Sequence, residues 1–290
     1  MCKNSKVLLN HSTKQFNICI LAQTKTKDMK KALFTAIIVF FFNSCGNKVK
    51  ETNSETTLEE VAQVKEYPTA ISYIFEAHGG ITTWNKMNNL CFEIEKPSGA
   101  EMHSTDLKSR KTLIASNAFN IGNDGEKIWI EEIDKPYEGN PKFYYNLMFY
   151  FYAMPFILAD DGIVYTDLED TILEDKTYGA IKIGYNAGVG ETPEDEYIVF
   201  YDKETHKMAW LAYTITFFDK TKSTDWHYIK YDTWLTENGL LLPQTLVWFD
   251  VKEGKPSTPK NTVAFSKVLV SESVLENSTF QAPDGSRVVE

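Results

Sequence analysis

The feature that most constrains the fold of this chain is a set of predicted strands that are apolar on both faces. In residues 208–217, one face carries Met208 and Trp210. The opposite face carries Leu211 and Tyr213. Successive side chains of a strand point to opposite faces of its sheet, so both faces of this strand need a cover. The pattern therefore predicts a sheet with packing on both sides.

Short turns rich in Asn, Asp and Gly separate the predicted strands. Asn123-Asp124-Gly125 is a strong hairpin signal, because the central residues of such turns take positive φ. The strands expected on this basis span residues 90–94, 119–122, 127–131, 181–185, 196–201, 207–217, 226–235, 240–251 and 262–270. Connections this short join antiparallel neighbours, since parallel ones need a crossover of roughly a dozen residues. We expect a mostly β, α+β fold built on a curved antiparallel sheet.

Two segments are expected to cover the sheet as helices. Residues 69–78 have apolar side chains at helical spacing, follow a proline that suits a first helical turn, and precede Gly79-Gly80. Residues 143–154 are apolar or aromatic all round, and a helix of that kind is buried on nearly every side. We predict that one or both helices pack on the concave face of the sheet.

The N-terminal part of the chain resembles a bacterial lipoprotein export signal, in which a basic start and a short apolar run precede Cys45. The apolar run, at about 1.5 Å per residue, is too short for the roughly 30 Å hydrocarbon core of a bilayer. We expect a cleaved signal at 29–44, acyl chains such as palmitate on Cys45, a flexible tether over 45–66 and one domain at 67–290. Residues 1–28 fit none of these parts, and we interpret them as a mis-assigned start. An ordinary secretory signal that contains a cysteine is the alternative.

Charge and cysteine content limit the partners of the mature chain. The whole chain has a net charge of −10, and removal of residues 1–44, with seven Lys and one Asp, leaves −16. Such a surface repels nucleic acid, so nucleic-acid binding is excluded as a function. An acylated Cys45 cannot pair, and Cys91 lies between Leu90 and Phe92 in a predicted strand. We expect Cys91 to be an inert buried thiol and the chain to contain no disulfide.

Several motifs of the chain resemble those of a family of uncharacterised bacterial lipoproteins. They are Ala77-His78-Gly79-Gly80 with Trp84, Asp106-Leu107-Lys108-Ser109-Arg110-Lys111, Met154-Pro155-Phe156-Ile157-Leu158-Ala159-Asp160-Asp161-Gly162, Gly190-Glu191-Thr192-Pro193-Glu194-Asp195-Glu196-Tyr197, Trp210-Leu211-Ala212-Tyr213-Thr214 and Gly239-Leu240-Leu241-Leu242-Pro243. The resemblance covers residues 70–290. That family is similar to the LolA-like lipoprotein-carrier superfamily, whose members fold as a half-open β-barrel closed by helices around a hydrophobic cavity. The resemblance implies this fold, and it implies lipid handling only by analogy.

The sequence lacks the motifs of common catalytic sites, namely a nucleophile elbow, a His-Glu-x-x-His helix, a phosphate-binding loop and a Cys-x-x-Cys pair. We therefore predict that the protein is not an enzyme and binds no cofactor or metal. Asp160, Asp161, Glu191 and Glu194 keep two alternatives open, an envelope hydrolase with an acidic cleft and a Ca²⁺ site. His78 is expected to end the first helix as an imidazolium, which the helix dipole favours.

The leading hypothesis is a lipoprotein that binds a lipid, an acyl chain or another hydrophobic ligand in the concave face of the sheet. The predicted ligand-binding residues are Phe143, Leu147, Met148, Phe151, Met154, Phe156 and Trp210. We expect a monomer in the cell envelope, anchored through Cys45 and facing the periplasm. Gly46 is not an inner-membrane retention signal, so the outer membrane is the expected place. The other alternative is a structural or interaction lipoprotein with a filled core and an exposed aromatic patch.

Overall fold

The structure of the protein is a computed structural model, and it describes residues 17, 19–20, 65–186, 192 and 194–290. The predicted signal segment, the predicted acylation site at Cys45 and Glu191 lie outside these residues. Among the described residues, no helix is both long enough and apolar enough to cross a bilayer.

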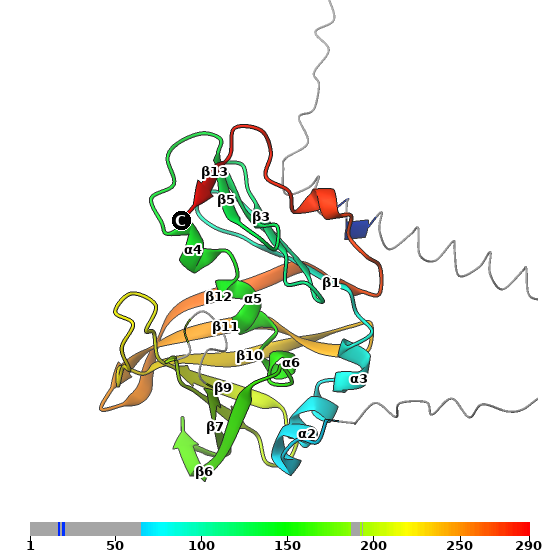
Figure 1. Cartoon of the computed structure of the whole chain (residues 1–290). Helices are drawn as coiled ribbons and strands as arrows, with labels where there is room; N and C mark the ends of the chain where they lie inside the picture. Colours follow the sequence, from blue (N-terminus) through cyan, green and yellow to red (C-terminus); the bar gives the residue numbers. More distant parts are fainter. Residues whose placement is uncertain (1–16, 18, 21–64, 187–191, 193) are drawn as a thin grey trace, which may run out of the picture.

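Thirteen strands of the described chain form one antiparallel sheet with two free edges (Figure 1). Their bounds are β1 Asn89–Ile94, β2 Glu101–Asp106, β3 Thr112–Ala115, β4 Phe119–Asn123, β5 Ile128–Glu132, β6 Ile163–Leu173, β7 Lys176–Tyr185, β8 Tyr197–Tyr201, β9 Met208–Tyr213, β10 His227–Glu237, β11 Leu240–Lys252, β12 Lys255–Ser271 and β13 Arg287–Val289. The order across the sheet is β13-β5-β4-β3-β2-β1-β12-β11-β10-β9-β8-β7-β6. Two meanders are therefore joined where β1 pairs with β12, and the expected open antiparallel sheet is confirmed.

Short helices cover the sheet. They are α2 Thr69–Ala77, α3 Ile81–Trp84, α4 Pro141–Tyr144, α5 Leu147–Tyr152, α6 Met154–Ile157 and the 3₁₀ turn η1 Asn277–Thr279. The helix predicted at 69–78 is confirmed as α2. It ends at Gly79 and Gly80, whose φ angles of +102° and +84° suit glycine. A Cβ on Gly79 would also lie 2.1 Å from the carbonyl oxygen of Gly239, so the close approach of these two segments requires glycine.

The prediction of one helix over residues 143–154 is wrong, because three short helices occupy this region. Pro141 starts α4, and the Asn140 side chain caps it by accepting hydrogen bonds from two backbone N–H groups. The backbone leaves the helical conformation at Asn146, between α4 and α5, and at Ala153, between α5 and α6. Bulky aromatic side chains have modest helix propensity, so packing against the sheet decides the path of this segment.

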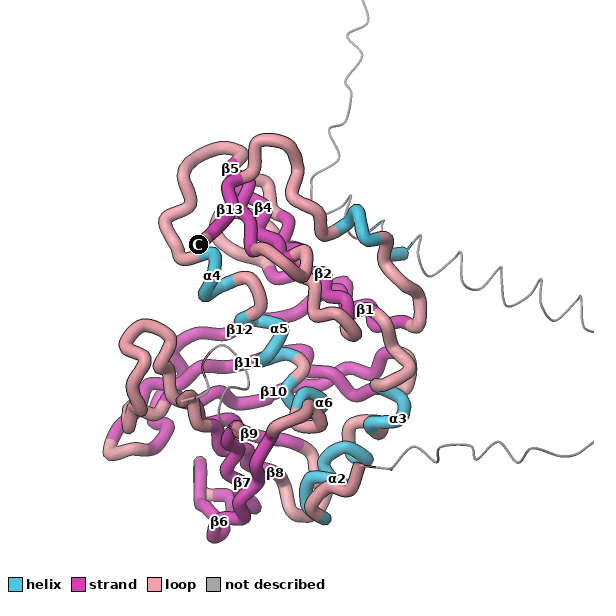
Figure 2. The backbone as a smooth tube through the Cα atoms, viewed as in Figure 1, coloured by secondary structure: helices cyan, strands magenta, loops and turns pink. Residues whose placement is uncertain are grey.

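The sheet bends around these helices, and the main hydrophobic core fills the hollow (Figures 1 and 2). Phe92 of β1, Leu211 of β9 and Ile229 of β10 meet Tyr152 and Phe156 in this core. All five side chains are fully buried. Helices therefore pack on the concave face, as expected.

The outer face of the sheet is buried as well, in two smaller clusters. One cluster packs Cys91 and Met102 against Phe280 and the indole of Trp129, whose Nε1–H donates to the carbonyl of Phe280 at 2.9 Å. Glu93, two residues after Cys91, is only 2 % exposed and pairs with a lysine of β12. Strand β1 is therefore buried along both faces and is not the half-buried strand that its polar positions predict.

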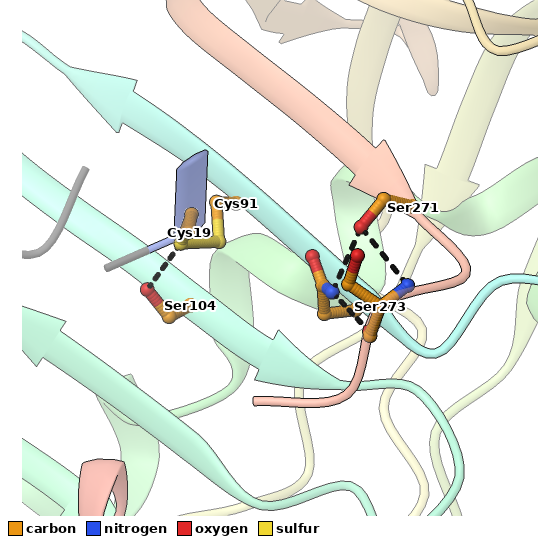
Figure 3. The surroundings of a disulfide bond; sticks show 6 residues. Cys19, Cys91, Ser104, Ser271 and Ser273 are labelled. Carbon is orange, nitrogen blue, oxygen red and sulfur yellow. Dashed lines mark hydrogen bonds between the residues drawn. A yellow bond between two sulfur atoms is a disulfide. The ribbon is translucent and has the colours of Figure 1, made fainter. Parts of the chain in front are cut away.

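The expectation of a free Cys91 and no disulfide is contradicted by the structure. Cys91 is fully buried, as predicted, but it is bonded to Cys19 (Figure 3). Cys19 is 1 % exposed, and its Sγ lies 3.8 Å from the Ser104 hydroxyl on β2. The prediction failed because residues 1–28 were assigned no place in the fold, which removed Cys19, the residue that bonds to Cys91.

Candidate functional site

A cavity of about 250 Å³ opens between α4 and α5 on one side and β7 and β8 on the other. The residues that line it are Lys142, Phe143, Tyr145, Asn146, Leu147, Tyr150, Phe151, Tyr185, Thr192, Asp195, Tyr197 and Phe217. Most of these side chains are aromatic or aliphatic, and a few carry a hydroxyl, an amide or a charge. This composition is typical of sites for small apolar ligands with one polar end.

The helical wall of the cavity is held in place by contacts to the sheet. The Tyr231 hydroxyl of β10 donates a 2.6 Å hydrogen bond to the carbonyl oxygen of Phe151. The Phe151 ring lies 4.9 Å from the ring of Tyr213 and 5.8 Å from that of Trp248. Trp248 donates its indole N–H to the Tyr213 hydroxyl at 3.1 Å. These contacts fix the inner end of α5, so Phe151 forms a rigid part of the wall.

The sheet wall of the cavity carries two tyrosines and a buried carboxylate. Burial raises the pKa values of Tyr185 and Tyr197, with smaller contributions from neighbouring tyrosines and acids. Both hydroxyls therefore stay protonated at neutral pH. Asp195 is 8 % exposed, and its Oδ1 accepts hydrogen bonds from the backbone N–H and the hydroxyl of Thr216, each at 2.7 Å. These bonds tie the segment before β8 to the segment after β9.

Three of the predicted ligand-binding residues, Phe143, Leu147 and Phe151, line this cavity. Met148, Met154 and Phe156 instead lie in the main core, where each is at most 5 % exposed. Phe156 stacks on the Trp84 ring at 4.5 Å. Most of the hollow in the bent sheet is therefore filled by side chains, and the cavity occupies one end of it.

Trp210 lies on the opposite face of the sheet and does not line the cavity. Its neighbour Leu211 belongs to the concave core, and successive strand residues face opposite ways. Trp210 packs edge to face with Phe249, and the Nζ of Lys230 lies 5.4 Å from its ring centre. The sequence pattern could not distinguish these faces because both are apolar.

Nine lining residues were missed by the sequence reasoning: Lys142, Tyr145, Asn146, Tyr150, Tyr185, Thr192, Asp195, Tyr197 and Phe217. Tyr185 is the last residue of β7, and Tyr197 is the first residue of its neighbour β8. Their rings lie 6.1 Å apart. An aromatic residue on each side of a strand connection is a signal that could have identified this wall.

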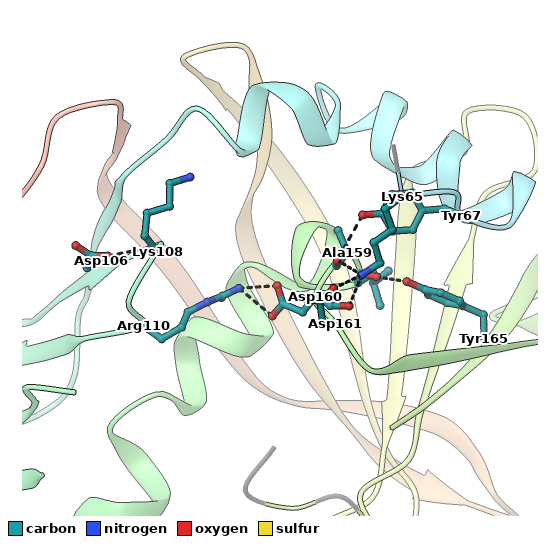
Figure 4. A network of polar contacts seen from close by, with 10 residues as sticks. Lys65, Tyr67, Asp106, Lys108, Arg110, Ala159, Asp160, Asp161 and Tyr165 are labelled. Atoms are coloured by element: carbon teal, nitrogen blue, oxygen red, sulfur yellow. Dashed lines mark hydrogen bonds and ion pairs between the residues drawn. The ribbon is translucent and has the colours of Figure 1, made fainter. Parts of the chain in front are cut away.

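The acidic turn after α6 forms ion pairs and not an acid–base cleft. Arg110, in the turn between β2 and β3, donates from Nη2 to both carboxylate oxygens of Asp160 at 2.6 and 2.8 Å (Figure 4). Lys65 lies 2.9 Å from Asp161. Burial raises the pKa of Asp160, and the Arg110 charge opposes this rise. The arrangement ties the β2–β3 turn and the segment before α2 to the turn after α6.

The remaining acidic candidate with a described position, Glu194, is exposed. Within the described ranges, no group of three or more His, Cys, Asp or Glu side chains is placed to hold a metal ion. The described geometry therefore provides no specific support for the Ca²⁺ or hydrolase alternatives.

A buried cluster of titratable groups was also missed. Glu101 and His103 alternate along β2 and face α4, where the Tyr144 hydroxyl donates to Glu101 Oε2 at 2.6 Å. The His103 Nε2 lies 3.5 Å from the same oxygen. Burial lowers the pKa of His103, so its ring is neutral at pH 7. None of these three side chains lines the cavity.

His78 ends α2 as predicted, but not in the predicted charge state. Its Nδ1 donates to the carbonyl of Ile74 at 2.8 Å, and its ring lies 4.7 Å from that of Trp234. The side chain is fully buried, and burial lowers its pKa from 6.5 to about 4. The cost of removing a charge from water exceeds the gain from the helix dipole, so the imidazole is neutral.

Comparisons with known proteins find one family model and several solved structures that are similar to this chain. Residues 137–240 match the model of a family of unknown function, DUF6503, and this segment contains all the residues that line the cavity. No curated protein matches the chain.

Three similar solved structures illustrate the likeness. A LolA superfamily protein from Nitrosomonas europaea has 9 % identity and a TM-score of 0.38, with 67 % of this chain and 88 % of that chain covered. A DUF1329 family protein from Desulfovibrio piger has 12 % identity and a TM-score of 0.42, with 73 % and 98 % covered. The lipoprotein LppX of Mycobacterium tuberculosis has 9 % identity and a TM-score of 0.24, with 51 % and 88 % covered. One of these structures is thus a member of the superfamily that the sequence motifs resemble, but at these scores the likeness carries no conclusion about superfamily, ligand or location.

Proposed function

We propose that the protein binds one apolar chain or ring of an amphiphile in the cavity between α4–α5 and β7–β8. The observation that carries this proposal is a cavity of about 250 Å³ with an aromatic and aliphatic wall. Buried apolar surface contributes about 25 cal/mol per Å² to such binding. The polar atoms at the wall, from Asn146, Tyr185 and Asp195, suit the polar end of the ligand.

The volume limits the class of ligand. A water molecule takes about 30 Å³ in the liquid, so 250 Å³ equals roughly eight waters. Sites for drug-sized ligands start at about 300 Å³. The cavity therefore suits a single alkyl segment or a single ring system, and it is too small for all the acyl chains of a lipoprotein at once.

Binding of a fluorescent fatty-acid analogue to the full chain tests this function. Leu147→Trp fills the cavity and should weaken saturable binding at least tenfold. Leu168→Trp makes the same change on the edge strand β6, where Leu168 is 40 % exposed, and should leave binding unchanged. Thermal unfolding followed by circular dichroism confirms that both variants are folded. Equal affinity of both variants, or no saturable binding to the native chain, would refute the proposal.

We further propose that the protein acts in the cell envelope, held at a membrane by acyl chains on Cys45. This rests on the export signal in residues 29–46. Cys45→Ala should move the protein from the membrane pellet to the soluble fraction, and an unchanged distribution would refute the anchor.

Processing before Cys45 has a consequence for the disulfide, because Cys19 lies upstream of the cleavage point. If the chain is cleaved before Cys45 and the disulfide is also formed, residues 1–44 stay attached only through the Cys19–Cys91 bond and are released on reduction. Intact-mass measurement of the membrane-extracted protein, before and after reduction, shows whether residues 1–44 are present and whether the disulfide holds them.

A further inference from the structure

Three phenylalanines form a contiguous group at the edge of the cavity, here named the aromatic rim: Phe143, Phe217 and Phe218. The Phe143 ring lies 5.2 Å from each of the other two, and Phe217 and Phe218 are also 5.2 Å apart. Phe143 and Phe217 line the cavity. The rim is therefore continuous with the cavity wall.

Phe218 is displayed to solvent. It is 64 % exposed, which makes it the most exposed aromatic side chain of the described chain. Burying a phenylalanine side chain is favourable, and Phe218 forgoes most of this gain within the fold. A tight turn produces the display, since Lys220 has a φ of +55° and its N–H donates to the carbonyl of Thr216 at 2.8 Å.

Lysines surround the rim although the chain as a whole is acidic. Lys142 lines the cavity beside Phe143, and the Nζ of Lys220 lies 4.6 Å from the centre of the Phe217 ring. Residues 214–226 carry two lysines and two aspartates, so this loop is neutral in a chain with a net charge of −10. With the cavity residues Lys142 and Asp195 included, the rim region is still neutral and therefore less acidic than the chain as a whole, and two of its lysines, Lys142 and Lys220, lie at the phenylalanines.

We propose that the aromatic rim docks on the surface of a phospholipid bilayer that contains anionic lipid. Aromatic side chains favour the membrane–water interface, and lysine side chains are attracted to an anionic membrane surface. Phe218 enters the headgroup region, and Lys142 and Lys220 reach lipid phosphates. Docking in this orientation brings the cavity mouth to the membrane surface. An amphiphile then passes between bilayer and cavity without exposing its chain to water, a step that rests on the proposed function.

Hydrogen–deuterium exchange of the full chain with lipid vesicles tests the docking surface. Vesicles of phosphatidylcholine with about one third phosphatidylglycerol should slow amide exchange in residues 214–226 at least threefold. The readout is local to this loop, so insertion of the N-terminal segment elsewhere does not reproduce it. Phe218→Ser should abolish the protection. Val274→Ser, at a 66 % exposed apolar residue after β12, serves as the matched control and should keep it.

Two results would overturn the inference: no vesicle-dependent protection of this loop, or protection that persists unchanged in Phe218→Ser. Protection by an added soluble protein but not by vesicles would overturn it as well. The proposed function fails separately. Loop protection without probe binding refutes only the ligand, and probe binding without loop protection refutes only the docking surface.

Discussion

Acid should destabilise this protein through His78, because the folded chain resists protonating this side chain. The pKa of His78 is lowered by burial from 6.5 to about 4. Between these values the unfolded chain binds a proton that the folded chain does not. The stabilisation is therefore fully present above pH 6.5 and is lost as the pH falls towards 4. At roughly 1.4 kcal/mol per pKa unit, the loss is about 3 kcal/mol.

The substitution His78→Asn isolates this effect from that of other groups. Glu101 and Asp202 also have lowered pKa values and lose stability in acid, so the native curve alone does not identify His78. At pH 7 the variant should be less stable than the native chain, since it loses ring packing and the bond to the Ile74 carbonyl. By pH 4 the gap should shrink by about 3 kcal/mol, because asparagine takes up no proton.

Urea unfolding at pH 7.5, 6, 5 and 4 measures this difference. Ile71→Val is the matched control on the same helix, where Ile71 is fully buried. It should lower the free energy of unfolding by about 1 kcal/mol at every pH, because it removes one methylene and no titratable group. If the curves of His78→Asn and the native chain stay parallel over this range, the reasoning about the buried neutral imidazole is wrong.

Three further substitutions test packing, ion pairing and the disulfide. Gly122→Ala places a Cβ 2.3 Å from the buried ring of Trp129 and should lower the free energy of unfolding by about 1–3 kcal/mol. The control Gly184→Ala, with no atom within 4 Å of the added Cβ, should not lower it, and equal urea midpoints of the two variants would contradict this reasoning. Arg110→Gln removes a partly exposed ion pair in which one guanidinium nitrogen contacts both oxygens of Asp160. It should cost about 1 kcal/mol at pH 7 and less in high salt, and an unchanged midpoint at low salt would show that the pair contributes nothing. Cys19→Ser removes the disulfide to Cys91, which closes a loop of 72 positions, and should lower the free energy of unfolding by about 4 kcal/mol in the chain-entropy model. Identical unfolding of the variant and the native chain would show that the bond is not formed.

The hairpins and most strands could be predicted from local signals. Asn123-Asp124-Gly125 and Glu237-Asn238-Gly239 lie at the turns of β4–β5 and β10–β11 because these residues tolerate positive φ. Gly79 and Gly80 end α2 for the same reason. In contrast, β6 escaped notice, since an edge strand with exposed Asp167 shows little hydrophobic alternation.

The candidate site could be predicted only in part because it depends on contacts distant in sequence. The side chains of Phe143, Leu147 and Phe151 were identified from one apolar segment. The opposite wall, with Tyr185 and Asp195, is brought to them only by the bending of the sheet. The alternation of side chains along β9 could not show which face of the sheet Trp210 occupies, because both faces are apolar. The single helix predicted over residues 143–154 is instead interrupted at Asn146 and Ala153.

The pairing of β1 with β12 has a consequence for how the chain acquires its structure. Asn89 and Ser271 are neighbours across this seam but are 182 positions apart. Because the chain is made from its N-terminus, the edge of β1 that pairs with β12 therefore stays unpaired until nearly the whole chain has been made. Closing so long a loop is slow, and an open strand edge invites association with other chains. Strand β12, which is made near the end of synthesis, thus protects the first strand, β1.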